Sequence, residues 1–137
     1  MWGGEPLLAL DRIEFVVDFF QHTSLSVTID IETNASLITD EIAKKLFNWK
    51  IHIGISMDGT PELHNRQRRM VSGKPSAEVV ERGIRNLQKY YGEDIGGIIV
   101  VTKHNYKYVK EILDYFIYTL HLTSMKFNLV RDNDHAP

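Results

Sequence analysis

Stretches of apolar residues at helical spacing alternate with strand-like runs along this chain of 137 residues, and this alternation restricts the fold more than any other feature. The pattern predicts helices over residues 6–22, over 40–47 with Thr39 as N-cap, after Ser76 as N-cap, and after Asn105 as N-cap. It predicts strands over residues 26–33, 50–57, 97–102 and 125–130. Such alternation is typical of right-handed βαβ units, so the sequence predicts an α/β fold with a parallel sheet, as a barrel or doubly wound.

The segments that follow the predicted strands are the first places to look for a site, because ligands of parallel α/β folds bind at the carboxyl ends of strands. The chain opens on Gly3-Gly4-Glu5-Pro6 and runs directly into a helix, so we expect it to start inside a βα unit whose strand is missing or very short. The polar stretch from Met57 to Pro75 is long for a connection in a compact domain, which favours a functional loop.

The chain contains no cysteine, which excludes disulfides, thiolate nucleophiles and cysteine-ligated zinc or iron-sulfur sites within it. The formal net charge of -2 predicts no broad surface for nucleic acid or anionic membrane. Apolar runs such as Ile98 to Val101 are far too short to span a bilayer. Glu5 and Asp11 stand where a secretion signal would be basic and then apolar, so we expect a cytoplasmic protein.

The glycine pair at the start admits two interpretations. Adjacent glycines let a backbone approach a ligand closely, and free carbonyls beside the Glu5 carboxylate would hold an ammonium group. Alternatively, the pair forms a turn ahead of a helix that Glu5 and Pro6 initiate. The six histidines have no metal-site spacing, and Asp132-Asn133-Asp134 lacks the later glycine and glutamate of a calcium loop, so no metal site is expected.

Three motifs at successive predicted strand ends resemble the core of radical S-adenosylmethionine (radical SAM) enzymes. The motifs are Gly3-Gly4-Glu5-Pro6, Glu32-Thr33-Asn34, and Ser56-Met57-Asp58-Gly59 followed by His64-Asn65-Arg66-Gln67-Arg68. Among these enzymes the chain is most similar to the branch that includes anaerobic sulfatase-maturating enzymes and other peptide-modifying enzymes with a C-terminal SPASM domain. The resemblance implies an incomplete (β/α)6 partial TIM-type barrel with parallel strands and the first βα unit missing. Residues 1–131 would form this core and residues 132–137 a polar tail.

The resemblance also implies roles for individual residues around S-adenosylmethionine. In the family, the segment matching Gly3-Gly4-Glu5-Pro6 binds the amino group of the methionine moiety. Asn34 matches a residue that lines the same cavity, with Ala35 in place of the usual glycine. The alternative for Asn34 is a turn asparagine that stabilises a positive φ. Ser56 would bond the ribose or the carboxylate of the cofactor.

The segment after Ser56 departs from the family pattern. Arg68 matches the last residue of a His-Asp-x-x-Arg pattern and would pair with a carboxylate, but the aspartate of that pattern is Asn65 here. We therefore expect the salt bridge within this loop to be weakened or lost. Asp58 would face the mouth of the site, or would simply form a turn with Gly59. Without the resemblance, Arg66, Arg68 and Arg69 would be a solvated run of charge.

In the family, a Cys-x3-Cys-x2-Cys loop holds a [4Fe-4S] cluster that cleaves S-adenosylmethionine reductively, and the radical formed abstracts a hydrogen atom from a peptide or protein substrate. This chain has none of those cysteines. The sequence therefore predicts a truncated core that retains part of the S-adenosylmethionine pocket and is inactive alone. One alternative is a non-catalytic α/β module that binds a small ligand, or a partner chain that supplies the missing strand. Another is a flavodoxin-like regulatory or electron-transfer domain, which leaves the motifs unexplained.

Overall fold

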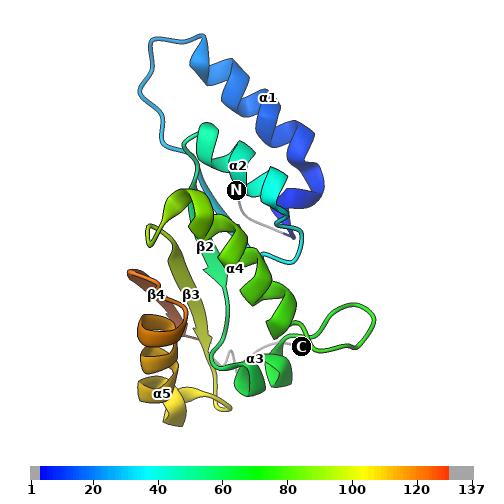
Figure 1. Ribbon diagram of the computed structural model, residues 1–137, viewed down its shortest axis with the longest axis vertical. Coiled ribbons are helices and arrows are strands. Elements are labelled where there is room, and N and C mark those ends of the chain that lie inside the picture. Colours follow the sequence, from blue (N-terminus) through cyan, green and yellow to red (C-terminus); the bar gives the residue numbers. More distant parts are fainter. Residues whose placement is uncertain (1–3, 130–137) are drawn as a thin grey trace, which may run out of the picture.

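The fold is built on a parallel four-stranded sheet with the strand order β1-β2-β3-β4 (Figure 1). The computed structural model describes residues 4–129. The strands are β1 (Asp30–Thr33), β2 (His52–Ser56), β3 (Gly96–Val101) and β4 (Ser124–Leu129). All three strand pairings are parallel, which confirms the predicted α/β class.

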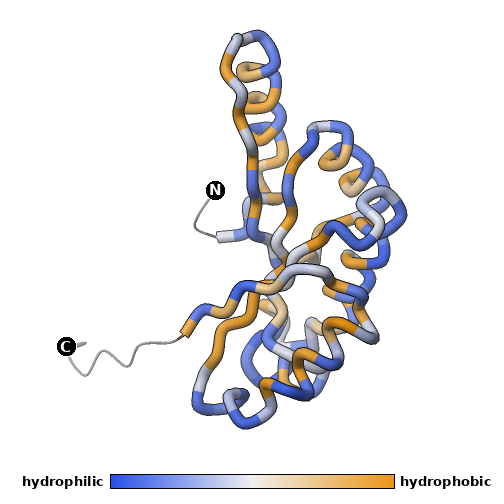
Figure 2. The backbone as a smooth tube through the Cα atoms, turned by 90° about the vertical axis from the view of Figure 1, so that its left-hand side faces the viewer, coloured by the Kyte–Doolittle hydropathy of each residue, from blue (hydrophilic) through white to orange (hydrophobic). Residues whose placement is uncertain are grey.

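Helices connect the strands and precede the first one. They are the 3-10 helices η1 (Pro6–Ala9) and η2 (Tyr106–Tyr108), the α-helices α1 (Leu10–Gln21), α2 (Asp40–Asn48), α3 (Pro61–Gln67), α4 (Ala77–Tyr91) and α5 (Val109–Asp114), and the π-helical turn η3 (Tyr115–Thr119). In side view the backbone curves into a C, with an open side (Figure 2). No helix within residues 4–129 combines the length and the apolar character needed to cross a bilayer.

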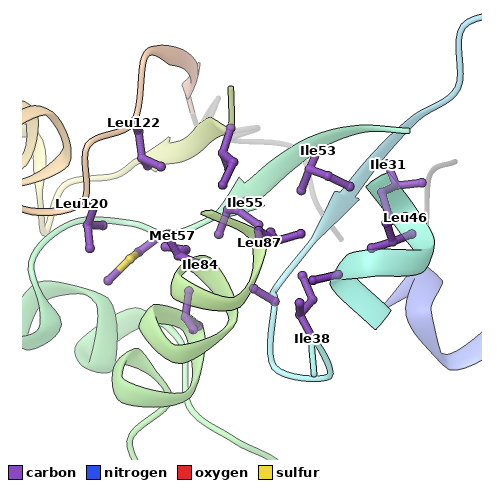
Figure 3. Close-up of a cluster of buried hydrophobic side chains, with 14 of the residues drawn as sticks. Ile31, Ile38, Leu46, Ile53, Ile55, Met57, Ile84, Leu87, Leu120 and Leu122 are labelled. Atoms are coloured by element: carbon purple, nitrogen blue, oxygen red, sulfur yellow. The ribbon is translucent and has the colours of Figure 1, made fainter. Parts of the chain in front are cut away.

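The apolar core lies between the sheet and α2 and α4. Alternate residues of β1 and β2, namely Ile31, Ile53 and Ile55, are buried against Leu46 of α2 and Leu87 of α4. Figure 3 shows these side chains converging with Met57, Ile84 and the two leucines that follow η3. Because each fully buried aliphatic side chain contributes about 1.5–3 kcal/mol, this cluster fixes which face of each strand points outward.

The other face of the sheet carries mainly polar and small residues, with Ile98 and Val100 of β3 as apolar members. Glu32, Gly54, Ser56 and Lys126 lie at the alternate positions of their strands. A Cβ on Gly54 would lie 2.6 Å from Ile98 Cδ1, so glycine is needed for that isoleucine to pack across β2. Lys126 Nζ lies 2.9 Å from Glu32 Oε1, a contact that joins the two outer strands over the two between them.

Several predicted elements are shorter than expected. The helix over 6–22 begins as η1 and continues as α1 to Gln21. The strand over 26–33 is paired only from Asp30, because Asp30 is opposite His52, the first residue of β2. Strands over 50–57 and 97–102 are found at 52–56 and 96–101. The last strand begins at Ser124, and its predicted end at Val130 and the predicted tail over 132–137 lie outside the described residues.

Helix caps account for the remaining differences. Thr39 caps α2 as predicted, since its Oγ1 accepts a hydrogen bond from Ile42 N at 3.3 Å. Ser76 and Asn105 stand at N-cap positions, but neither side chain bonds the helix that follows.

The prediction of a continuous loop from Met57 to Pro75 is wrong. Pro61 begins α3 within this segment, and residues 69–75 form a small hairpin closed by an Arg69–Pro75 bridge.

Candidate functional site

The chain segments leaving β1, β2 and β3 emerge at the same edge of the sheet, because the strands are parallel. Asn34 follows β1, Asp58 follows β2, and Asn105 follows β3 after a short turn. The chain leaving β2 leads into α3 and then α4 (Figure 1). The predicted site residues are therefore gathered at this edge, and their contacts form two separate groups.

Glu5 organises the first group. Its Oε1 accepts hydrogen bonds from Leu7 N at 3.2 Å and from Thr33 Oγ1 at 2.6 Å, and its Oε2 accepts one from Asn34 N at 2.8 Å. The carboxylate thus initiates η1 and holds the end of β1 at the same time. All three donors are neutral, and no cationic group of the described residues lies within 4 Å of this carboxylate. Its negative charge is therefore solvated but not neutralised.

The turn after β1 is tight and locally strained. Asn34 Oδ1 accepts a hydrogen bond from Ser36 N at 2.9 Å, an Asx turn that occupies the amide oxygen. The positive φ falls on Ala35, at 57°, and not on Asn34. The backbone here packs against α4, since a Cβ on Gly83 would lie 2.3 Å from Ala35 O. Of the two interpretations of Asn34, the turn role is thus present in the structure, although the strained residue is its neighbour.

The glycine pair is only partly described. Gly4 has φ 62°, a left-handed conformation that favours glycine, and nothing lies within 4 Å of the position a Cβ would take. Pro6 begins η1, as a proline suited to a first helical turn should. Gly3 lies outside the described residues. The described part of the segment is consistent with both a turn and an open approach for a ligand.

Asp58 and Arg68 form the second group. Arg68 Nε donates to Asp58 Oδ2 at 2.6 Å and Nη2 to Asp58 Oδ1 at 3.4 Å, while Val100 N donates to Oδ1 at 2.9 Å. The side chain of Asp58 is 3% exposed and that of Arg68 34%. Asn65 makes no bridge to Arg68, but Arg68 is paired all the same, because Asp58 supplies the carboxylate. Asp58 is also more than a turn residue, since it joins β2, β3 and the end of α3.

The neighbouring arginines differ from Arg68. Arg66 pairs with Glu62 on the exposed side of α3, and Arg69 Nη1 donates to Gly73 O within the hairpin. These two residues fit the interpretation of a solvated charge run. Arg68 does not, because most of its side chain is buried beside Asp58.

His64 is buried in α3, with 1% of its surface exposed. Its Nδ1 accepts a hydrogen bond from Asp58 N at 3.2 Å, and its Nε2 lies 3.0 Å from Ser76 Oγ. Burial lowers the pKa of the imidazole from 6.5 to about 4, although the Asp58 carboxylate opposes the shift. His64 is therefore a neutral histidine whose ring bonds two parts of the chain.

Asn65 has a role that the sequence pattern did not predict. Its Oδ1 accepts hydrogen bonds from Ser76 N at 2.8 Å and Ala77 N at 2.9 Å, so Asn65 of α3 satisfies the first amides of α4. Ser76 Oγ is then free to bond elsewhere, and donates to Arg68 O at 2.9 Å. An asparagine three residues before an arginine does not by itself reveal this role, because the contact depends on the hairpin that returns the chain.

The prediction that the Asn105 side chain caps the last helix is wrong. Asn105 is fully buried, and its Nδ2 donates to Asp58 O at 3.2 Å and Val100 O at 2.9 Å. Its Oδ1 accepts from Thr102 N at 2.7 Å, so it closes the turn after β3 instead of capping a helix. Ser56 is half-buried at the end of β2, and its hydroxyl has no hydrogen bond to any described residue.

A cavity of about 530 Å³ opens between the turn after β1, the hairpin and the start of α4. Asn34 and Ser36 line one side, and His64, Arg68 and Ser76 line another. The cavity thus brings Asn34 and Arg68 together, whereas Gly4, Glu5, Ser56 and Asp58 are not part of its wall. Asn34 links the two groups, because its backbone is bonded to Glu5 while its side chain borders the cavity with Arg68.

Two cofactors are expected at this site, S-adenosylmethionine and a [4Fe-4S] cluster, and the residues present fit only the first. An amino-acid moiety carries an ammonium and a carboxylate, which suit the unneutralised Glu5 carboxylate and the Arg68 guanidinium, whose Nη1 has no hydrogen bond to any described residue. A [4Fe-4S] cluster does not fit, because its thiolate ligands are absent from the sequence. No group of three acidic or histidine side chains within residues 4–129 is arranged to hold a metal ion.

Comparisons with known proteins agree with this geometry. A family model described as the radical SAM superfamily matches residues 1–116. The chain is 36% identical over 131 residues to an uncharacterized protein of Methanocaldococcus jannaschii, covering 94% of this chain and 45% of that protein. It is 34% identical over 118 residues to a cysteine-type anaerobic sulfatase-maturating enzyme of Clostridium perfringens, covering 83% of this chain and 32% of the enzyme.

The solved structure of native anSMEcpe with bound AdoMet and the Kp18Cys peptide is similar over 96% of this chain and 37% of that one. The TM-score is 0.88 and the sequence identity 30%. This similarity confirms a fold of the partial TIM-type barrel kind for the described sheet and helices. The chain spans less than half the length of each of these relatives.

Proposed function

The chain belongs to the radical SAM superfamily, and from that premise we propose that its strand ends bind the methionine part of S-adenosylmethionine. Glu5, with the Gly4 backbone, would receive the ammonium group, and Arg68 would receive the carboxylate. Ser56 would add a hydroxyl contact to the ribose or the carboxylate, and Asn34 would line the site between the two charged residues. S-adenosylmethionine supplies the radical chemistry of the family when a cluster is present.

One observation carries this proposal. The first group of contacts leaves an anion without a cationic partner among the described residues, and the second leaves the Nη1 edge of a guanidinium without an acceptor. A zwitterionic amino acid complements both at once. The relatives supply independent support, since anSMEcpe has been solved with bound AdoMet.

Calorimetric titration with S-adenosylmethionine tests the proposal. We expect binding by the unaltered chain and a loss of at least about tenfold in affinity for Glu5→Gln, because removing the charge costs at least about 1.4 kcal/mol of attraction for the ammonium group. Glu41→Gln, on the exposed side of α2, is the matched control and should bind like the unaltered chain. No heat with the unaltered chain, or equal affinity for Glu5→Gln, would overturn the proposal.

We also propose that this chain alone does not cleave S-adenosylmethionine, because it contains no cysteine to hold a cluster. It would serve as part of a core whose remaining pieces, cluster ligands included, come from elsewhere, and whose substrate class is the peptide or protein class of the sulfatase-maturating relatives. Anaerobic reconstitution with iron and sulfide should yield no protein-bound iron-sulfur chromophore and no 5′-deoxyadenosine. Formation of both by this polypeptide would contradict the proposal.

A second candidate function is docking of a chain that pairs with the outer edge of β1. It is favoured by exposed apolar residues on the helices that precede β1, since Leu8, Phe15 and Phe19 are 77%, 69% and 58% exposed. Such a stripe beside an outer strand is typical of a covered surface. Analytical ultracentrifugation should show that the unaltered chain associates and that the double variant Phe15→Ser/Phe19→Ser does not. If both proteins are monomeric and neither binds a chain that supplies a strand, this candidate function is excluded.

A further inference from the structure

The imidazole of His64 is linked to the main chains of both members of the Asp58–Arg68 pair, to Asp58 directly and to Arg68 through Ser76. Its Nδ1 accepts from the backbone N–H of Asp58 at 3.2 Å. A backbone amide can only donate, so Nδ1 carries no proton and Nε2 carries one. Nε2–H then donates to Ser76 Oγ at 3.0 Å, and Ser76 Oγ–H donates to Arg68 O at 2.9 Å. The direction of every hydrogen bond in the chain of contacts is thereby fixed.

These contacts form a closed ring with the ion pair. It runs from Asp58 N through His64 and Ser76 to Arg68 O, and returns through the Arg68 guanidinium to the Asp58 carboxylate. His64 is 1% exposed and Asp58 2%, so the bond between Asp58 N and the imidazole is shielded from water, whereas the bonds of Ser76 and Arg68 are part-buried. The ring fixes the backbone at both ends of the pair, and hence the direction in which the remaining guanidinium edge points.

We propose that His64 is a positioning residue for Arg68: a neutral imidazole that holds the main chains of Asp58 and Arg68 at a set separation, so that Nη1 of Arg68 presents its N–H groups to the carboxylate of an amino-acid ligand. The proposal rests on the ligand assignment made above for Arg68. It adds that the recognition of the carboxylate depends on a residue whose two ring nitrogens both bond the protein.

The chemistry of the ring explains why the residue is a histidine. The position needs an acceptor toward Asp58 N–H and a donor toward Ser76 on opposite sides of one rigid, neutral group, which the Nε2–H tautomer supplies. Asparagine offers an acceptor close to the place of Nδ1, and glutamine offers a donor close to the place of Nε2. Each of these substitutions therefore retains one side of the ring and breaks the other.

The test distinguishes a His64 that positions Arg68 from a His64 that only stabilises the fold. It uses two ligands that differ only in the amino-acid moiety and its linking carbons. S-adenosylhomocysteine carries the ammonium and carboxylate, and 5′-methylthioadenosine lacks them, while both are uncharged at sulfur. We expect His64→Asn to weaken S-adenosylhomocysteine about tenfold and to change 5′-methylthioadenosine less than about twofold. Arg68→Met should do the same, and the double variant should add little, as for residues that act through one another.

His64→Gln provides the second variant, and His104→Asn, at an exposed histidine outside the ring, the matched control. Circular dichroism checks that each variant is folded. Equal weakening of both ligands would make His64 a merely structural residue, and unchanged binding of S-adenosylhomocysteine would overturn the proposal outright.

A ligand-independent measurement keeps the two proposals apart. If the unaltered chain binds neither ligand, the ligand assignment fails, and the NMR signal of Arg68 Nε–H then decides whether His64 positions the guanidinium. We expect this proton to exchange slowly in the unaltered chain, because it is bonded to Asp58 at 2.6 Å, and much faster in His64→Asn and His64→Gln. An unchanged signal and exchange rate in both variants would overturn the positioning role.

Discussion

Glu5 and Asp58 each hold a strand end through a carboxylate, yet their electrostatic surroundings differ. Glu5 accepts three hydrogen bonds from neutral donors and remains half-buried, whereas Asp58 accepts two from the Arg68 guanidinium and one from Val100 N and is almost fully buried. The depth of burial explains the contrast. A buried carboxylate needs a countercharge, while one that keeps contact with water does not.

Because of this difference, one sheet edge offers both signs of charge. At Glu5 the negative charge is left available, and at Asp58 it is consumed by Arg68, whose Nη1 edge is then left available. Asn34 connects the two places through its backbone bond to Glu5 and its position on the cavity wall.

Asp58→Ala should destabilise the chain most, by about 4 kcal/mol, because it leaves Arg68 without its anion and Val100 N without an acceptor. Urea unfolding followed by circular dichroism measures the loss. Glu62→Ala removes the exposed partner of Arg66 and should cost less than about 1 kcal/mol. Similar losses of unfolding free energy for the two variants would mean that the buried Asp58–Arg68 pair contributes no more than the exposed Glu62–Arg66 pair.

Acid should weaken the Asp58 group through His64, whose folded-state pKa of about 4 lies below the ordinary 6.5. The unfolded chain binds this proton more readily, so the contribution is fully present above pH 6.5 and is lost as the pH falls toward 4, by about 3 kcal/mol in all. Asp58, Arg68 and Glu81 are the charged groups that act on the imidazole. Unfolding free energies measured from pH 7 to 4 should fall more steeply for the unaltered chain than for His64→Asn; parallel curves would contradict the assignment.

Glu5→Ala should cost about 2 kcal/mol, because it leaves the buried Thr33 hydroxyl without an acceptor, but less than Asp58→Ala, because it leaves no buried charge unpaired. Glu5→Gln retains one acceptor oxygen and should cost about half as much. The comparison with Asp58 would be reversed if Glu5→Ala proved the more destabilising of the two in urea.

Gly83→Ala should have the smallest effect, a loss of about 1 kcal/mol. The added Cβ would meet Ala35 O at 2.3 Å and push α4 from the turn after β1, an overpacking cost of about 1–3 kcal/mol that is offset by about 1 kcal/mol of helix propensity. Glu78→Ala, on the exposed side of α4, is the control and should change stability by less than about 0.5 kcal/mol. A higher unfolding free energy for Gly83→Ala would show that the turn after β1 can move at little cost.

The members of the site were recognisable in the sequence, but their partnerships were not. Strand periodicity placed Asn34 and Asp58 directly after strands, and resemblance identified Glu5 and Arg68. The family pattern places the partner of Arg68 at position 65, which is Asn65 here, whereas the carboxylate comes from Asp58, ten residues earlier in the chain. A motif records spacing along the chain, and this contact depends on how α3 turns back toward β2.

The sequence by itself determined the order of the strands and of every helix but α3, the parallel sheet, the N-cap at Thr39 and the strand ends at which polar residues gather. These features follow from local periodicity and from backbone preferences that act over a few residues. Tertiary structure decided where the strand over 26–33 is paired, which caps form, and which carboxylate neutralises which cation. Pairing needs a neighbouring strand, and a buried charge is matched by whichever group the fold brings within reach. For that reason Asn65 and Asn105 hold main-chain groups remote from their sequence neighbours, and His64 stands between Asp58 and Arg68.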